Sequence, residues 1–476
     1  MNYIPPAITG ELGRSADAAG DRNILSRGNR SEFLSHIDGV QISDLIAKFG
    51  SPLFVFSERR IRDKVQRARE AFRALYPETT FAWSYKTNYI AAICNIMHQE
   101  GSIAEVVSDF EYRKAVKLGV PADQIIFNGP DKPADSLRRA LSAGSIVQID
   151  NWDELGMIET IASELKVSAR VGIRTWFDTG FAPVWSKFGF SLANGEARRA
   201  AERVLANPKL RLETLHTHIG TYILAPDAYA VAADRLLALR DLLFNETGYL
   251  VPAINLGGGF PSYSLLHGMV GPAELTVPPI ESYAAAIARV FNVLPKGYRP
   301  RLYLESGRHL IDEAGYLLAS VVAVKGAERE IYTNFQSTAA KARLVLGEHT
   351  RGGYIVDAGV NFLYTSTWYS VGVMPTRPSN MQPQPIRLYG NLCMNIDVIR
   401  ETVTLPPLEV GDTIAMHPVG AYNVTQWMQF ISYRPAVVLI GTDGNVEIIR
   451  QREELADIDH GEVVPERLGA TWSPST

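Results

Sequence analysis

One lysine lies where an enzyme of the parallel α/β class would place its chemistry. Residues 81–85 form an apolar, strand-like run that leads into Lys86, and polar residues and a helix-like stretch, 90–97, follow it. The carboxyl end of a buried strand, just before a helix, is where a parallel α/β barrel carries its reactive groups. Because an amine held there is partly desolvated, we expect Lys86 to favour the neutral form that can make a Schiff base. A surface lysine at a strand end is the alternative.

Two further motifs could bind a phosphate and an aromatic ring. The run Asn-Leu-Gly-Gly-Gly-Phe at 255–260 includes Gly258 and Gly259, and glycines let backbone N–H groups approach an anion closely. In the run Glu-Ser-Gly-Arg at 305–308, Arg308 could contact a phosphate through two hydrogen bonds, and Glu305 could keep a ring nitrogen protonated. Together with Lys86, these features predict pyridoxal phosphate (PLP) as cofactor. Taken singly, they could equally be a tight turn and a surface ion pair.

Histidine and cysteine residues add candidates of a different kind. His216 and His218 lie two positions apart at the end of a strand-like run. We expect their side chains to face opposite sides of the strand, so a shared zinc ion is not predicted, and His218 is the candidate to stack on an aromatic ring. Cys393 lies among turn-forming residues, where its thiol could be accessible. A buried, inert cysteine is the alternative.

The elements that must position these residues alternate along the chain. Strand-like segments separated by helical stretches occur at 80–85, 103–107, 125–128, 146–149, 168–174, 212–218, 254–256 and 301–305. This alternation predicts a (β/α)8 barrel, a TIM-like fold of the α/β class. After about residue 310 short strand-like segments punctuated by Gly and Pro follow, at 316–325, 354–357, 385–389, 413–416 and 435–440, which predicts a C-terminal β domain.

These patterns also predict how the chain is divided. We assign residues 56–310 to the barrel and residues 36–55 plus 311–450 to the β domain, because the strand-like run at 52–56 is expected to complete its sheet. Residues 1–35 are rich in Gly, Ser, Asn and charge and are expected to form a loose leader. Residues 451–476 are expected to form a peripheral tail.

Composition limits the classes of function. The 476-residue chain is long enough for two domains, and its net charge of -4 gives no reason to expect a nucleic acid or an anionic membrane as partner. No apolar run approaches the length of a membrane span, and the N-terminus lacks the pattern of a signal peptide. Two cysteines do not make a disulfide framework, so we expect a cytoplasmic protein.

The order and spacing of these motifs resemble the fold-type III PLP-dependent amino acid decarboxylases, nearest the diaminopimelate and ornithine decarboxylase group. The resemblance covers roughly residues 40–445 and implies an alanine racemase-like barrel with a β-barrel or sandwich domain. It depends on eight elements in the same order: Tyr85-Lys-Thr-Asn, Glu105-Val-Val-Ser, Ser186-Lys-Phe-Gly, His216-Thr-His-Ile-Gly, Gly257-Gly-Gly-Phe, Glu305-Ser-Gly-Arg, Cys393-Met-Asn-Ile-Asp and Gly420-Ala-Tyr.

The resemblance implies a role for each matching residue. Lys86 is implied as the Schiff-base lysine, His218 as the imidazole stacked on the pyridine ring, and Glu305 as the carboxylate facing the ring nitrogen. Cys393 is implied as a thiol from a second subunit that protonates the substrate carbon after CO₂ leaves, so a homodimer with a shared active site is expected. The other cofactor-binding residues implied are Glu105, Arg174, Thr221, Gly258, Gly259, Arg308 and Tyr422.

A carboxylate at Glu305 favours decarboxylation over racemisation. A protonated ring takes up the electrons that decarboxylation leaves on Cα, whereas the ring nitrogen of an alanine racemase faces an arginine. A PLP-dependent racemase or epimerase stays open as one alternative. A non-catalytic PLP-binding protein is another, although such relatives usually lack a second domain.

The sequence departs from the family pattern at the substrate pocket. Met394 follows Cys393, where related enzymes carry an acidic residue that meets a distal amine. Thr365-Ser366 replace the Arg-Pro pair whose arginine binds a carboxylate of diaminopimelate. We therefore expect a modified amino acid or conjugate as substrate, as in siderophore or other secondary-metabolite pathways. The substrate-binding residues expected are Tyr364, Trp368, Tyr369, Met394 and Asp397, and two milder departures are Glu105 for aspartate and Ser306 for proline.

Overall fold

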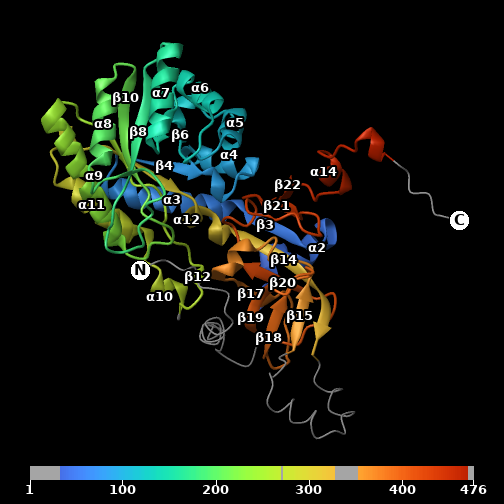
Figure 1. Ribbon diagram of the computed structural model, residues 1–476. Helices are drawn as coiled ribbons and strands as arrows, with labels where there is room; N and C mark the ends of the chain where they lie inside the picture. Colours follow the sequence, from blue (N-terminus) through green and yellow to red (C-terminus); the bar gives the residue numbers. More distant parts are fainter. Residues whose placement is uncertain (1–32, 270–271, 327–351, 470–476) are drawn as a thin grey trace, which may run out of the picture.

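Eight parallel strands close into a barrel within the part of the chain that the computed structural model describes, residues 33–269, 272–326 and 352–469. Each strand pairs with the next in parallel, and the last pairs with the first (Figure 1). In barrel order they are β4 (Thr79–Ser84), β5 (Ile103–Val106), β6 (Ile125–Phe127), β7 (Ile146–Ile149), β8 (Ala169–Trp176), β10 (Leu210–Thr217), β11 (Ala253–Asn255) and β13 (Arg301–Ser306).

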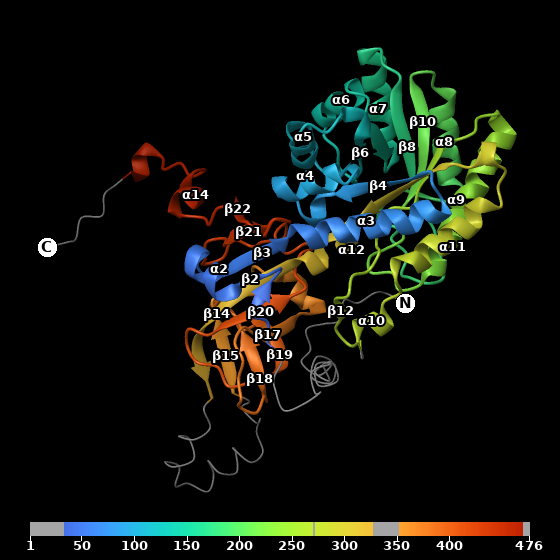
Figure 2. The same ribbon diagram turned by 180° about the vertical axis from the view of Figure 1, so that it is seen from behind.

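Helices surround this barrel and present apolar faces to it (Figure 2). They are α3 (Glu58–Leu75), α4 (Ala91–Gln99), α5 (Asp109–Lys117), α6 (Ala134–Ser142), α7 (Trp152–Leu165), α8 (Glu196–Ala206), α9 (Pro226–Thr247) and α11 (Ile280–Asn292).

Local sequence explains where these helices begin and end. Helix α3 begins after Ser57, whose hydroxyl accepts a hydrogen bond from Arg60 N at 3.1 Å and so caps the helix. Helix α9 begins with Pro226 at its first turn and ends at Gly248, which adopts a left-handed conformation with φ of 74°.

A second, mostly antiparallel sheet follows the barrel. Its strand order is β19-β18-β15-β14-β3-β21-β22, and β20 pairs with β14 and with β17. The strands are β3 (Leu53–Ser57), β14 (Gly315–Lys325), β15 (Gly353–Val356), β17 (Gly372–Pro375), β18 (Gln384–Tyr389), β19 (Val398–Leu405), β20 (Thr413–His417), β21 (Ala436–Ile440) and β22 (Val446–Arg450).

The predicted fold class, a (β/α)8 barrel with a C-terminal β domain, is confirmed. The division into residues 56–310 and 36–55 plus 311–450 stays a proposal; it is supported by β3, which lies between β14 and β21. Most of the predicted leader, residues 1–32, and the end of the tail, residues 470–476, lie outside the described residues. Within the tail, α14 (Leu455–Asp459) stands away from both sheets in Figures 1 and 2.

Strand β19 was not among the predicted strands because charged residues interrupt its apolar pattern. Arg400 lies in its middle, yet the side chain is 5% exposed. Its guanidinium donates a hydrogen bond to Val371 O at 2.5 Å. This contact with a residue distant in sequence offsets the cost of burying the charge, which the local sequence does not indicate. In the described ranges no helix has the length and apolarity that crossing a membrane requires.

Candidate active site

Lys86 lies in a short turn of the barrel that is hydrogen-bonded to the β domain. The turn, η1 (Tyr85–Thr87), directly follows β4. Its backbone is held from the other domain, because Thr425 Oγ1 donates to Lys86 O and Tyr422 N donates to Thr87 O, both at 2.9 Å. The Lys86 ammonium donates to Glu105 Oε2 at 2.5 Å, and Glu105, at the end of β5, is fully buried. The amine is therefore placed at the carboxyl ends of the strands, where the sequence predicts it.

The charge of Lys86 differs from the prediction. Burial by itself lowers the pKa of this amine, but attraction to Glu105 and Glu305 outweighs it, so the pKa of Lys86 is raised above its ordinary value. The side chain also keeps 38% of its surface exposed. The expected neutral amine is thus wrong for the protein without a cofactor, and Glu105 is the neighbour that could take the proton.

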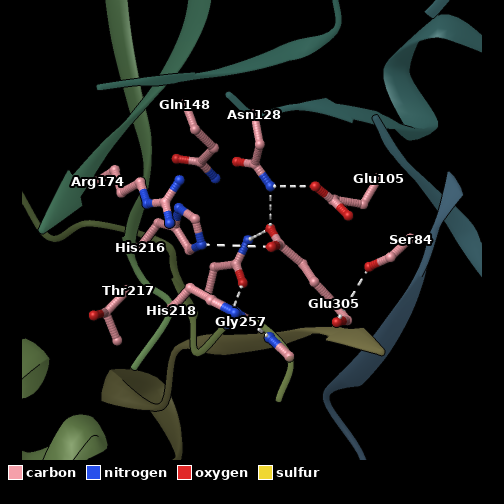
Figure 3. Close-up of polar contacts among 12 residues, drawn as sticks. Ser84, Glu105, Asn128, Gln148, Arg174, His216, Thr217, His218, Gly257 and Glu305 are labelled. Atoms are coloured by element: carbon pink, nitrogen blue, oxygen red, sulfur yellow. Dashed lines mark hydrogen bonds and ion pairs between the residues drawn. The ribbon is translucent and has the colours of Figure 1, made fainter. Parts of the chain in front are cut away.

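Glu305 is the buried carboxylate at the centre of the barrel mouth (Figure 3). Its side chain accepts hydrogen bonds at Oε1 from Asn128 Nδ2 at 2.8 Å and from Asn255 Nδ2 at 2.6 Å. Oε2 lies 3.5 Å from His216 Nε2. Burial alone would raise the pKa of Glu305, but His216, Lys86 and Asn128 hold it well below the usual range. Glu305 is therefore an anion over the whole physiological pH range.

The two histidines lie within the same polar cluster, which corrects the prediction that they face opposite sides (Figure 3). Residues two apart on an extended strand share a face, and His216 is within 3.5 Å of Glu305. His218 follows the end of β10; its Nδ1 accepts a hydrogen bond from Gly258 N at 3.0 Å. Burial and the nearby cations Arg174 and Lys86 lower the pKa of His218 to about 3, so its ring is neutral. Among the described residues no group of three or more potential ligands could hold a metal ion.

The glycine run packs against the end of β13 at very short range. A Cβ added to Gly258 would lie 2.0 Å from Glu305 O, and one added to Gly259 would lie 2.3 Å from Gly220 O. Gly259 also has φ of 96°, which disfavours a side chain. Only glycine therefore fits these positions, and the backbone N–H groups of this loop can come close to an anion.

Arg308 lies beside this loop, between two tyrosine rings. Its guanidinium is 4.2 Å from the ring centre of Tyr369 and 4.9 Å from that of Tyr422. Nη1 is 3.5 Å from Asp312 Oδ2, and the buried Nε has no hydrogen-bond partner. Tyr369, expected to contact substrate, is thus placed at the predicted phosphate subsite.

These residues fit PLP, by a test on their chemistry and packing. An amine for the aldehyde, a carboxylate with a lowered pKa for a pyridinium nitrogen and a neutral imidazole lie together at the barrel mouth. A cradle that a Cβ would fill and an arginine with a free N–H lie beside them. The pyridine ring with its aldehyde and the phosphate of the cofactor thus each have chemically matched partners.

Other predicted residues lie around this centre. Arg174 Nη1 is 3.6 Å from Asp150 Oδ1, and its guanidinium lies 4.5 Å from the ring centre of Phe188. Thr221 is exposed in the loop after β10. Tyr364 and Trp368 pack edge to face at 4.9 Å.

The loop that carries Cys393 lies in the β domain. Cys393 is exposed and Met394 is half-buried. Asp397 is buried, and its carboxylate accepts hydrogen bonds from Val360 N and Leu392 N, both at 2.8 Å. These two hydrogen bonds indicate that Asp397 stabilises the loop. They do not favour the substrate contact that was predicted for it.

Sequence reasoning missed the two asparagines that hold Glu305. Asn128 follows β6 and Asn255 ends β11, and Asn128 Nδ2 also donates to Glu105 Oε1 at 2.9 Å. Their signal was a polar residue at the carboxyl end of a barrel strand, which is the same signal that identified Lys86.

Comparisons with known proteins agree with this geometry. The family model of the pyridoxal-binding domain of pyridoxal-dependent decarboxylases matches residues 59–312. Diaminopimelate decarboxylase of Methanothermobacter thermautotrophicus is 30% identical over 448 residues, covering 91% of this chain and 96% of that protein. The crystal structure of diaminopimelate decarboxylase from M. jannaschii has a TM-score of 0.79 at 27% identity, with 91% and 96% covered. A lysine/ornithine decarboxylase from Vibrio vulnificus shares the fold, with a TM-score of 0.67 at 21% identity over 85% and 98% of the two chains.

Proposed function

Because this chain belongs to the family of pyridoxal-dependent decarboxylases, we propose that it uses PLP to remove the α-carboxylate of an amino acid with an altered side chain. The observation that carries the reaction type is the buried carboxylate of Glu305, which accepts hydrogen bonds from Asn128 and Asn255 and lies 3.5 Å from His216. PLP, when bound, supplies a ring that takes up the electron pair left on Cα once the ring nitrogen is protonated. Glu305 keeps that proton in place by charge and hydrogen bonding.

The remaining residues have complementary roles in this proposal. Lys86 holds the cofactor covalently, and Glu105 accepts a proton from its ammonium. The neutral ring of His218 packs beside the cofactor ring without adding a competing positive charge. Gly258, Gly259 and Arg308 hold the phosphate, and the contacts of Arg308 with Tyr369 and Tyr422 keep its guanidinium oriented.

We also propose that the active unit is a homodimer in which Cys393 of each subunit serves the other subunit's site. The exposed position of Cys393 in the β domain supports this arrangement. Its thiol would then deliver a proton to Cα after CO₂ has left. Mixing Lys86→Ala with Cys393→Ala protein should restore activity, because a mixed dimer contains one site with both residues intact. Failure of the mixture to regain activity, with dimer exchange demonstrated, would contradict the shared site.

Two unpaired cysteines fit a cytoplasmic location.

The substrate proposal concerns the distal end of the amino acid. Thr365, where the resemblance places an arginine in diaminopimelate decarboxylases, is buried, and its N and Oγ1 both donate to Asn423 Oδ1, at 3.2 and 2.8 Å. Met394 carries no charge to pair with an amine. Neither Thr365 nor Met394 supplies a cation for a distal carboxylate or an anion for a distal amine. We infer a substrate whose distal group is modified or conjugated and uncharged.

The direct test is a mass-spectrometric screen of purified, PLP-loaded protein for loss of CO₂ from amino acids and conjugates. We expect turnover of a compound with an uncharged distal group and poor turnover of meso-diaminopimelate, lysine and ornithine. Efficient turnover of meso-diaminopimelate would refute the altered specificity. Exchange of the α-hydrogen with deuterium in the absence of CO₂ loss, for every compound in the screen, would favour a racemase instead.

A further inference from the structure

A second cavity lies between the barrel and the β domain. It has a volume of about 300 Å³ and is lined by α4, by α5 and by the loops and strand β22 of the β domain. The start of α4 and Lys114 of α5 line it together with the end of β22, and Figure 1 shows β22 close to α4. Thr425, which donates its hydroxyl to the backbone of Lys86, lines this cavity too, whereas Lys86, Glu105, Gly258 and Arg308 do not. The cavity is therefore separate from the predicted cofactor site.

Positive charge dominates its walls. Lys114, Arg434 and Arg450 line the cavity. Both arginines share the carboxylate of Glu453, at 2.9 and 2.8 Å. Lys114 forms no ion pair within 4.0 Å in the part of the chain that is described. Among the described residues, Glu453 is thus the carboxylate that lies within 4.0 Å of any of these three cations.

The pKa and the surroundings of Lys114 agree with a positive charge that no carboxylate of the described residues neutralises. Burial and repulsion from Arg450 and Lys117 lower the pKa of Lys114. Its ammonium lies 5.2 Å from the ring centre of Tyr89, which is also part of the wall. A desolvated lysine beside an arginine is costly unless an anion compensates it.

Aromatic rings and unused N–H groups complete the cavity. The Arg450 guanidinium lies 5.2 Å from the ring centre of Trp427. Trp427 Nε1 and Arg450 Nε are buried and have no hydrogen-bond partner. Buried N–H groups without partners beside a lysine and two arginines provide donors that an anion could accept from.

We propose that this cavity, defined by Tyr89, Lys114, Trp427, Arg434 and Arg450, binds a small molecule that carries a carboxylate or phosphate dianion. Lys114 and the two arginines supply the charge-assisted contacts. The site is distinct from the phosphate subsite at Gly258 and Arg308.

Isothermal titration calorimetry on PLP-loaded protein tests the proposal, because the cofactor then occupies its own phosphate subsite. The probes are inorganic phosphate and malonate at constant ionic strength, which controls for general screening. We expect at least one of them to bind, and to bind about tenfold or more weakly in Lys114→Gln, in line with the loss of one charge-assisted contact. Preference for phosphate or for malonate identifies which of the two anion chemistries the cavity takes.

Lys117→Gln is the matched control. Lys117 lies on the same helix, α5, and is exposed outside the cavity, so Lys117→Gln removes the same charge and should lower affinity far less than Lys114→Gln does. Because Lys114 has no carboxylate partner, Lys114→Gln should fold normally; Arg434→Gln serves as an independent second variant. Absence of binding of both probes up to about 10 mM, a concentration that corresponds to very weak affinity, would overturn the proposal. So would binding by Lys114→Gln and by Arg434→Gln that is as tight as binding by the unaltered protein.

Discussion

The substitution Gly258→Ala tests the close packing between the glycine loop and the end of β13. The added Cβ would lie 2.0 Å from Glu305 O, whereas ordinary van der Waals contact begins at 3.4 Å. The loop and the strand would therefore have to separate by about 1.4 Å. The neighbouring atom belongs to the backbone of a barrel strand, so it cannot rotate away as a flexible side chain would.

Two consequences follow from that separation. Overpacking of this kind destabilises proteins by about 1–3 kcal/mol, which we expect as a lower free energy of unfolding. The movement also pulls Gly258 away from His218 Nδ1 and from Tyr229 OH, bonded at 3.0 and 2.7 Å. The movement weakens hydrogen bonds from the loop to the phosphate, and because one hydrogen bond to a charged group contributes about 1.5–3 kcal/mol, we expect PLP affinity to fall by about 10- to 100-fold.

Two measurements separate these effects. Denaturant unfolding of the protein without PLP gives the stability change, and titration with PLP, followed by the absorbance of the bound cofactor, gives affinity. Gly297→Ala is the matched control, because a Cβ there would meet no atom within 4 Å. Surface substitutions of that kind change stability by about 0.5 kcal/mol or less. If Gly258→Ala binds PLP as tightly as the unaltered protein and unfolds at the same denaturant concentration, the packing argument is wrong.

Three further predictions concern charge and proton transfer. Glu105→Gln removes the strongest attraction on the Lys86 ammonium, so the pKa of Lys86 should fall. Attachment of the cofactor, followed by absorbance, should then reach its midpoint at lower pH. An unchanged or higher midpoint would contradict this. Burial and nearby cations lower the pKa of His218 to about 3, so its contribution to stability is complete above about pH 6.5, the pKa in the unfolded protein, and is lost as the pH falls below that value. In His218→Gln, the denaturant midpoint of unfolding should therefore decline less steeply between about pH 6.5 and 4. An equally steep decline would show that other groups cause it. Cys393→Ala should keep the absorbance of the bound cofactor but lose or misdirect the product, measured by mass spectrometry, and unchanged products would remove Cys393 from proton delivery.

Much of this protein could be predicted from its sequence because the signals are local. Alternating apolar runs and helical stretches predicted the strands of the barrel to within a few residues, since periodicity depends only on neighbours in the chain. Lys86, the glycine run and Glu305 could be identified because each lies at or just after the carboxyl end of a strand, and strand ends of a parallel barrel converge. The family resemblance then indicated that these residues take part in one PLP-dependent reaction.

The tertiary structure alone decided the charge states and several contacts. Glu105 raises the pKa of Lys86 from 19 positions away, against the desolvation that the local sequence suggests. Asn128 meets Glu305 across 177 positions. Electrostatic energy depends on distance in space and on solvent access, which no sequence window contains. For the same reason the burial of Arg400 and the engagement of Asp397 by backbone N–H groups became visible only once the strands had been brought together.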